Sequence, residues 1–251
     1  MGLISTNNDK KTKIYSLGQA GFIIQSSSGQ LLAIDPYLSD CVERIEPDHI
    51  GYKRLLPKIV SPNELNLEVL ICTHFHRDHF DVDSVPLLMN CSKTMLLCPG
   101  DCCDDLTGID KGRTIVVSPG FNKKIGDFNI HIINCDHGTG APKAVGVIVE
   151  VDGNRILEVG DTCLRLDRKN EYLSFGSIDV LVAPINGAYG NMNERDCAEL
   201  SNALNPIITI PCHYGMFADQ GGNPGLFIKE MRKQCPNNKF YLMRLGEALE
   251  L

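Results

Sequence analysis

The segment Val69-Leu70-Ile71-Cys72-Thr73-His74-Phe75-His76-Arg77-Asp78-His79 joins an apolar run to a dense group of potential metal ligands. The apolar run, residues 69–72, predicts a short buried strand. Three histidines and one aspartate follow within residues 74–79, and a strand would deliver their side chains together to one edge of a sheet. Imidazole and carboxylate groups are the ligands of zinc-class and manganese-class ions. Because four such groups exceed what one ion needs if it is to keep a water, the spacing predicts two metals that share a hydroxide.

Three further candidate ligands come later in the chain. His137, Asp161 and His213 each stand shortly after an apolar run that predicts a strand. Loops at the edge of a rigid sheet are a common place for ligands, because the sheet fixes their positions. We therefore expect these three side chains to join the ligands of residues 74–79 in one site.

The chain alternates predicted strands and helices without a linker, a repeat or a low-complexity tract, which indicates one domain over residues 1–251. Residues 41–65 are polar and punctuated by proline, and we expect a loop insertion with one short helix there. Helices are predicted at residues 83–90, 193–204 and 226–234, with Asp83 and Asn193 as N-caps of the first two. Strands are predicted at residues 13–16, 22–25, 31–35, 69–72, 95–98, 114–117, 128–133, 145–151, 155–159, 180–183, 207–210 and 240–243.

Charge and composition limit the partners. The formal net charge of −7 argues against nucleic acid or an anionic membrane surface as the main partner, whereas a small anionic substrate remains compatible with a metal pair. The segment Met1–Lys13 is polar and has no apolar core, so we expect no signal peptide. No run of 18 apolar residues is present, so no membrane span is predicted. A homo-oligomer is compatible with the sequence.

The 11 cysteines are scattered and contain no C-x-x-C pair. Most lie within apolar runs, where a free cysteine behaves as a small hydrophobic side chain. A disulfide framework would be unusual in a chain of this length without a secretory signal. We therefore expect reduced thiols and a cytoplasmic location.

The order and spacing of the candidate ligands resemble those of the metallo-β-lactamase superfamily of metal-dependent hydrolases. The matching pattern is His74-x-His76-x-Asp78-His79, then His137, then Gly160-Asp161-Thr162, then Pro211-Cys212-His213. Further segments resemble the branch of that superfamily that contains L-ascorbate-6-phosphate lactonase: Leu17-Gly18-Gln19-Ala20-Gly21-Phe22, Asp35-Pro36-Tyr37-Leu38, Lys53-Arg54-Leu55, Pro184-Ile185-Asn186-Gly187, Gly190-Asn191-Met192-Asn193 and His213-Tyr214-Gly215-Met216-Phe217.

The resemblance implies an α/β fold of the αββα type, with two mixed sheets flanked by helices and the site at one edge. It also implies two divalent ions, zinc or manganese. His74, His76 and His137 would hold the first ion, Asp78, His79 and His213 would hold the second, and Asp161 would bridge them.

The implied activity is hydrolysis of a lactone or ester of a small sugar acid, with or without a phosphate group. A metal-bound hydroxide would attack the carbonyl carbon, Asp78 would orient it, and Asp161 would complete the catalytic pair. Two alternatives stay open on the same scaffold: a phosphodiesterase or nuclease, and a non-catalytic metal-binding module.

Other residues are candidates for supporting roles. Asp35 could hydrogen-bond a ligand histidine and fix its tautomer. Lys53 and Arg54, in the insertion, could bind a substrate phosphate. Three polar residues beside the site loops could contact substrate: Asn186, Asn191 and Tyr214.

Overall fold

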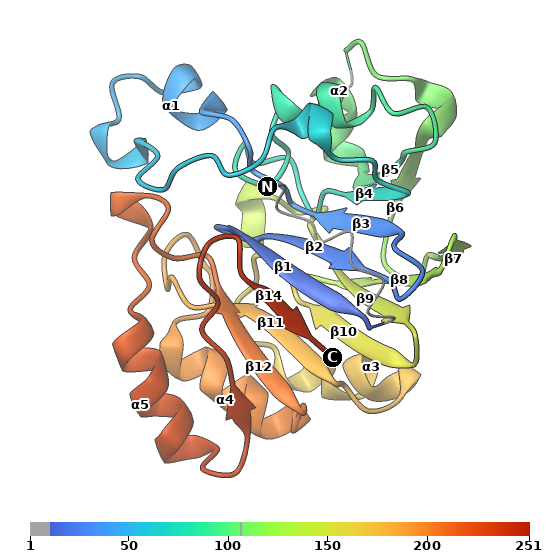
Figure 1. Ribbon diagram of the computed structural model, residues 1–251. Coiled ribbons are helices and arrows are strands. Elements are labelled where there is room, and N and C mark those ends of the chain that lie inside the picture. Colours follow the sequence, from blue (N-terminus) through green and yellow to red (C-terminus); the bar gives the residue numbers. More distant parts are fainter. Residues whose placement is uncertain (1–10, 106) are drawn as a thin grey trace.

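The computed structural model describes residues 11–105 and 107–251, and its core is two β-sheets packed face to face (Figure 1). Each sheet has seven strands, in the orders β14-β1-β2-β3-β4-β5-β6 and β13-β12-β11-β10-β9-β8-β7. Both sheets contain parallel and antiparallel pairs, and helices cover their outer faces. The predicted αββα sandwich of two mixed sheets is confirmed. Residues 1–10, which include most of the segment predicted to lack a signal peptide, lie outside the described residues.

The strands of the first sheet are β1 (Lys13–Gly18), β2 (Gly21–Gln25), β3 (Leu31–Ile34), β4 (Val69–Ile71), β5 (Met95–Pro99), β6 (Thr114–Val117) and β14 (Ala248–Glu250). Those of the second sheet are β7 (Asn122–Ile125), β8 (Phe128–Asn134), β9 (Val145–Val151), β10 (Asn154–Glu158), β11 (Val180–Pro184), β12 (Ile208–Cys212) and β13 (Lys239–Phe240). The α-helices are α1 (Cys41–Ile45), α2 (Ser84–Leu88), α3 (Lys169–Tyr172), α4 (Glu194–Leu204) and α5 (Pro224–Gln234). Short 3₁₀ turns are η1 (Ile50–Tyr52), η2 (Pro62–Glu64), η3 (Gly100–Asp105), η4 (Lys111–Arg113), η5 (Gly138–Gly140), η6 (Leu166–Arg168), η7 (Leu173–Phe175) and η8 (Ala218–Gln220).

The main core lies between the two sheets and follows from the alternation of side chains along each strand. In β8, Phe128, Ile130 and Ile132 point into this layer, whereas His131 between them is on the other face. A second apolar cluster fills the space under α2 on the outer face of the first sheet. A third packs α3, α4 and α5 against the outer face of the second sheet.

Strand direction brings the candidate ligands to one edge. In the second sheet, β8 and β10 are both antiparallel to β9, and β10, β11 and β12 are mutually parallel. The carboxyl ends of β8, β10 and β12 therefore lie at the same edge. In the first sheet, β4 contributes its carboxyl end there, and the Val145 amide donates a hydrogen bond of 3.0 Å to the Thr73 carbonyl across the two sheets. One edge of the sandwich thus collects the loops that follow four strands.

Some local predictions need correction. The Asp83 side chain makes no N-cap hydrogen bond to α2, because Asp81 accepts the amides of Asp83 and Ser84 instead. The predicted cap Asn193 is confirmed and forms a capping box with Asp196. Two short strands at sheet edges, β7 and β14, were not predicted. No helix within residues 11–105 or 107–251 combines the length and apolar character that crossing a membrane requires.

Candidate metal centre

Seven side chains with metal-ligand atoms meet at the edge of the sandwich described above. The first group is His74, His76 and His137, whose ligand atoms lie within 4.8 Å of one another. His74 Nε2 is 2.9 Å from His76 Nδ1, and His137 Nε2 is 3.2 Å from the same atom. The nitrogens of the three rings therefore converge on a common point.

The second group is Asp78, His79 and His213, which satisfies the same 4.8 Å limit. The two histidine Nε2 atoms are 3.3 Å apart, and Asp78 Oδ2 lies 3.7 Å from that of His79 and 3.5 Å from that of His213.

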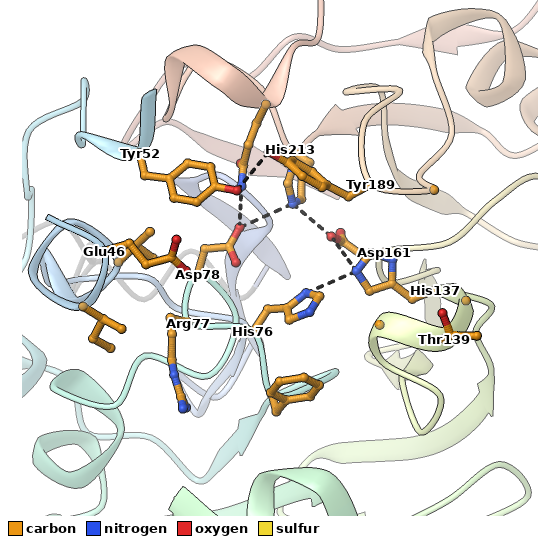
Figure 2. A pocket seen from close by; sticks show the side chains of 17 residues that line it. Glu46, Tyr52, His76, Arg77, Asp78, His137, Thr139, Asp161, Tyr189 and His213 are labelled. Carbon is orange, nitrogen blue, oxygen red and sulfur yellow. Dashed lines mark hydrogen bonds and ion pairs between the residues drawn. The ribbon is translucent and has the colours of Figure 1, made fainter. Parts of the chain in front are cut away.

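Asp161 stands between the two groups. Its Oδ2 is 3.0 Å from His213 Nε2, 3.4 Å from His79 Nε2 and 3.8 Å from His137 Nε2. One carboxylate is therefore close to both sets of nitrogens, which is the position that a bridging ligand requires. Figure 2 shows His76, Asp78, His137, Asp161 and His213 pointing toward one another.

The arrangement fits divalent cations. Ligand nitrogens at 2.0–2.1 Å from a tetrahedral zinc ion stand about 3.3 Å apart, close to the separations found here. A proton on His76 Nδ1 could hydrogen-bond to only one of the two nitrogens that face it, those of His74 and His137. A cation could bind the lone pairs of all three rings. The donor set of five imidazoles and two carboxylates suits zinc, manganese or iron.

The loops that carry these residues are held by unusual backbone conformations. Asp35 and His213 have positive φ angles, at 46° and 61°, and so do Gln19 and Tyr189 nearby, at 54° and 55°. Non-glycine residues in this region cost free energy and concentrate at functional sites. Gly160, before Asp161, also has a positive φ of 71°, and a Cβ there would come within 2.7 Å of the Val145 carbonyl oxygen.

Asp35 lies beneath the second group, where it was predicted to support a ligand histidine. This fully buried carboxylate is 2.7 Å from His79 Nδ1, and it accepts hydrogen bonds from the Thr73 amide and hydroxyl at 2.7 and 2.6 Å. A proton on His79 Nδ1 leaves Nε2 free to face the other ligand atoms. Orientation of this kind is the usual task of the groups behind metal ligands.

Two buried glutamines hold Asp78 from the opposite side. Gln19 Nε2 donates to Asp78 Oδ2 at 2.7 Å, and Gln220 Nε2 donates to the same oxygen at 3.3 Å. The two glutamine side chains also contact each other, and the His213 amide donates to the Gln19 carbonyl at 2.8 Å. Neither glutamine was predicted to be part of the site, although Gln19 stands within the Leu17–Phe22 segment that carried part of the resemblance.

The protonation of the two groups differs. Burial lowers the pKa values of His74, His76 and His137, so these rings are neutral and able to bind a cation. Burial alone would also lower the pKa of His79, but Asp161, Asp35 and Asp78 outweigh it and raise that pKa well above the usual value.

The carboxylates of Asp78 and Asp161 are ionised because the neighbouring histidines favour their charged forms. Burial would raise the pKa values of Asp78 and Asp161, but His79 and His213 outweigh it and lower both. Both aspartates therefore carry the negative charge that a cation site needs.

Glu158 is a buried acid below the centre. It ends β10 on the same side as Ile156, so its side chain points into the layer between the sheets. Oε1 accepts the Gly160 amide at 3.0 Å, and no residue among 11–105 and 107–251 hydrogen-bonds Oε2. Burial first, and then the nearby Asp35, raises the pKa of Glu158 well above its usual value. Glu158 is therefore a neutral support for the turn that presents Asp161.

The ligand set opens into a pocket of about 750 Å³. His76, Asp78, His137, Asp161 and His213 line its floor, while His74 and His79 are fully buried behind them. The remaining lining residues come from the insertion, the loop of residues 73–79 after β4, and three further loops: Val42, Ile45, Glu46, Tyr52, Phe75, Arg77, Gly138, Thr139, Gly140, Tyr189, Gly190 and Gln220.

The insertion of residues 41–65 forms part of this wall. Val42 packs with Tyr37, Met216 and Phe217 in a small apolar cluster that anchors α1. At the pocket mouth the hydroxyl groups of Tyr52 and Tyr189 are 2.9 Å apart.

Lys53 and Arg54, which were predicted to bind a substrate phosphate, are not among the residues that line the pocket. The Arg54 guanidinium donates to the Leu56, Tyr37 and Ser39 carbonyls at 2.8–3.1 Å and lies 4.8 Å from the Tyr37 ring centroid. Arg54 therefore fixes the insertion to the loop after β3. Lys53 is exposed to solvent.

The other three predicted substrate residues also lie off the pocket wall. Asn186 and Asn191 are buried, and no described residue hydrogen-bonds their side-chain amides. Tyr214 is partly buried and packs against the apolar cluster under α4 and α5. Their neighbours Tyr189, Gly190 and His213 line the pocket instead.

Comparison with known proteins gives consistent matches over most of the chain. The family model described as "Beta-lactamase superfamily domain" matches residues 13–213. A UPF0173 metal-dependent hydrolase of Pyrococcus furiosus is 27% identical over 246 residues, which covers 95% of this chain and 99% of that protein.

Solved structures share the fold. Igni18, a metallo hydrolase from Ignicoccus hospitalis, superimposes with a TM-score of 0.74 at 21% identity and covers 96% of this chain and 98% of its own. CmlA, a diiron β-hydroxylase from Streptomyces venezuelae, has a TM-score of 0.71 at 13% identity and covers 96% of this chain and 54% of its own.

Proposed function

The chain belongs to the β-lactamase superfamily, and from this premise we propose that it is a metal-dependent hydrolase that opens a small lactone or ester. The observation that carries the proposal is the convergence of seven ligand side chains on the floor of an open pocket. The Pyrococcus furiosus relative, named a metal-dependent hydrolase, supports the same class of activity.

His74, His76 and His137 would hold one divalent cation, and Asp78, His79 and His213 would hold a second. Asp161 would serve both, because its Oδ2 is close to nitrogens of both groups. Such cations, zinc or manganese, supply Lewis acidity and lower the pKa of water from about 15.7 toward about 7.

The protein residues position the reactants. Asp78 lines the pocket as an ionised carboxylate, and Gln19 and Gln220 fix its Oδ2, which leaves Oδ1 to accept a hydrogen bond from the attacking water. Buried hydrogen bonds of this kind hold a carboxylate in one orientation and so contribute to catalysis by pre-organisation. Asp161 is the second residue of the proposed catalytic pair, and its position between the two ligand groups fixes how they are placed relative to each other.

We propose that the reacting centre is the carbonyl carbon of a lactone or ester and that the substrate carries no phosphate group. Arg77 is the only lysine or arginine on the pocket wall within the described parts of the chain, and its Nη1 is 2.7 Å from Asp105 Oδ2. No lysine or arginine among the lining residues is therefore free to pair with a phosphate.

A hydrolysis panel tests the proposal. Protein reconstituted with zinc or manganese would be offered uncharged lactones, alkyl esters and a chromogenic phosphodiester. We expect turnover of lactones or esters that is abolished by chelation and by Asp161→Asn. Hydrolysis of the phosphodiester alone would favour the phosphodiesterase alternative. Tight metal binding with no turnover of any substrate would favour the non-catalytic module.

A further inference from the structure

One wall of the pocket is a single face of α1. Val42, Ile45 and Glu46 line the pocket, and their spacing of three and four residues places them on the same side of the helix. Two of these residues are apolar and one is acidic. Glu43, on the same helix, does not line the pocket.

Glu46 has no structural reason for its position. It occupies the C-cap of α1, and the carboxyl end of a helix disfavours a negative charge. No hydrogen bond or ion pair joins its carboxylate to another residue within 11–105 and 107–251, and the side chain is exposed to the pocket. Because Arg77 pairs with Asp105, Glu46 is the unpaired charge on the wall outside the ligand set.

Two tyrosines line the pocket near this wall, and Tyr52 is the nearer of them to Glu46. Tyr52 and Tyr189 line the mouth with their hydroxyls in contact, and Figure 2 shows Tyr52 on the same side of the pocket as Glu46. Tyr189 is 55% exposed, whereas one face of the Tyr52 ring is stacked on His49 at 3.8 Å between ring centroids. The hydrogen bond to Tyr189, and then burial, raises the pKa of Tyr52, which keeps its ring a neutral phenol.

We propose that this wall binds a cationic alkylammonium group of the substrate. The unpaired Glu46 carboxylate supplies the opposite charge, the exposed Tyr189 ring can attract a cation, and Val42 and Ile45 accept the alkyl part. The inference rests on the proposed hydrolase function, because it concerns the substrate of that same site.

Three acetate esters of similar size test the charge preference on the metal-loaded enzyme. They are 2-(trimethylammonio)ethyl acetate, its uncharged isostere 3,3-dimethylbutyl acetate, and 2-sulfoethyl acetate. We expect kcat/KM to be highest for the ammonium ester, roughly fivefold above the isostere, and lowest for the sulfonate. Glu46→Gln should remove most of the preference for the ammonium ester, whereas Glu43→Gln, the same change on the same helix, should leave it intact.

Binding of the three alcohol products, measured by calorimetry, separates this inference from the proposed function. If neither these esters nor the lactones and alkyl esters of the hydrolysis panel are hydrolysed, but the trimethylammonium alcohol binds more tightly than its isostere and Glu46→Gln removes the difference, the hydrolase proposal fails and the cation site stands. If the acetate esters are hydrolysed with no preference for the ammonium group, or if Glu46→Gln leaves the preference unchanged, the cation site is overturned and the hydrolase proposal stands. Equal binding of all three alcohols, without hydrolysis of any substrate in either set, would overturn both.

Discussion

Asp35 Oδ2 lies 2.7 Å from Nδ1 of His79, while Nε2 of the same ring faces Asp161 Oδ2 at 3.4 Å. The ring thus connects a fully buried carboxylate to the candidate metal centre. Thr73, which donates two hydrogen bonds to Asp35, fixes the carboxylate relative to the loop that carries the ligands.

Replacing Asp35 should weaken one cation selectively. In Asp35→Asn the amide no longer favours a proton on His79 Nδ1, so His79 Nε2 becomes a poorer ligand. We expect the affinity for the cation held by Asp78, His79 and His213 to fall about 10–100-fold, with the other cation affected less. Competition with a chromogenic chelator measures both affinities. Asp83→Asn is the control, because this exposed residue pairs with Arg44 away from the site; matching affinities in the two variants would remove the assigned role of Asp35.

The bridging position of Asp161 predicts a larger effect. Asp161→Asn removes the negative charge between the two ligand groups, and we expect both metal content and turnover to fall, the latter by about 100-fold or more. His131→Ala should keep both, because His131 lies 3.3 Å from Glu150 and packs on Phe175, off the pocket wall. If the two variants lost metal to the same degree, the ligand assignment would be wrong.

Glu158 predicts a pH-dependent stability difference. Its pKa is raised in the folded protein, so between about pH 4.5 and that raised pKa the folded state holds a proton that the unfolded state has lost. Stability of the unsubstituted protein should therefore decrease with rising pH in this range, by up to about 1.4 kcal/mol per pH unit from this group. Glu158→Gln removes the titration and keeps an oxygen that can accept the Gly160 amide. Urea unfolding of metal-free protein at pH 5, 6 and 7 measures the free energy of unfolding of both proteins. The stability of Glu158→Gln relative to the unsubstituted protein should increase as pH rises. A difference that stays constant with pH would mean that Glu158 is ionised when folded.

All 11 cysteines are within the described residues and none forms a disulfide. Thiol titration of the denatured, unreduced protein should therefore detect close to 11 groups per chain. A count below about seven would contradict the reduced state expected from compartment redox.

The sequence predicted the ligand cluster because each ligand follows a strand. Apolar runs fix where β4, β8, β10 and β12 end. β8 and β10 share a direction because both are antiparallel to β9, and β12 is parallel to β10 through β11, so the ends of these three strands meet at the edge where β4 also ends. His137, Asp161 and His213 therefore lie at this edge because each comes shortly after one of these strands. The same logic located Asp35 at the end of β3, where a support for a ligand histidine was expected.

Substrate residues could not be predicted in this way. Arg54 stands in a loop, and contacts with Tyr37 and backbone carbonyls, which no periodicity encodes, turn its side chain away from the pocket. Asn186 and Asn191 flank residues that line the wall, but neighbours in a loop often face opposite directions. Glu46 and Gln220 reach the site only because the insertion and the loop before α5 fold over the same edge. The short helix expected within residues 41–65 was the one available signal for Glu46.

The two-cation centre can be located by anomalous scattering from crystals of the protein reconstituted with zinc or manganese. We expect two peaks per chain, one bounded by His74, His76 and His137 and one by Asp78, His79 and His213, with Asp161 next to both. A single peak at full occupancy, or peaks away from these seven side chains, would contradict the two-cation centre.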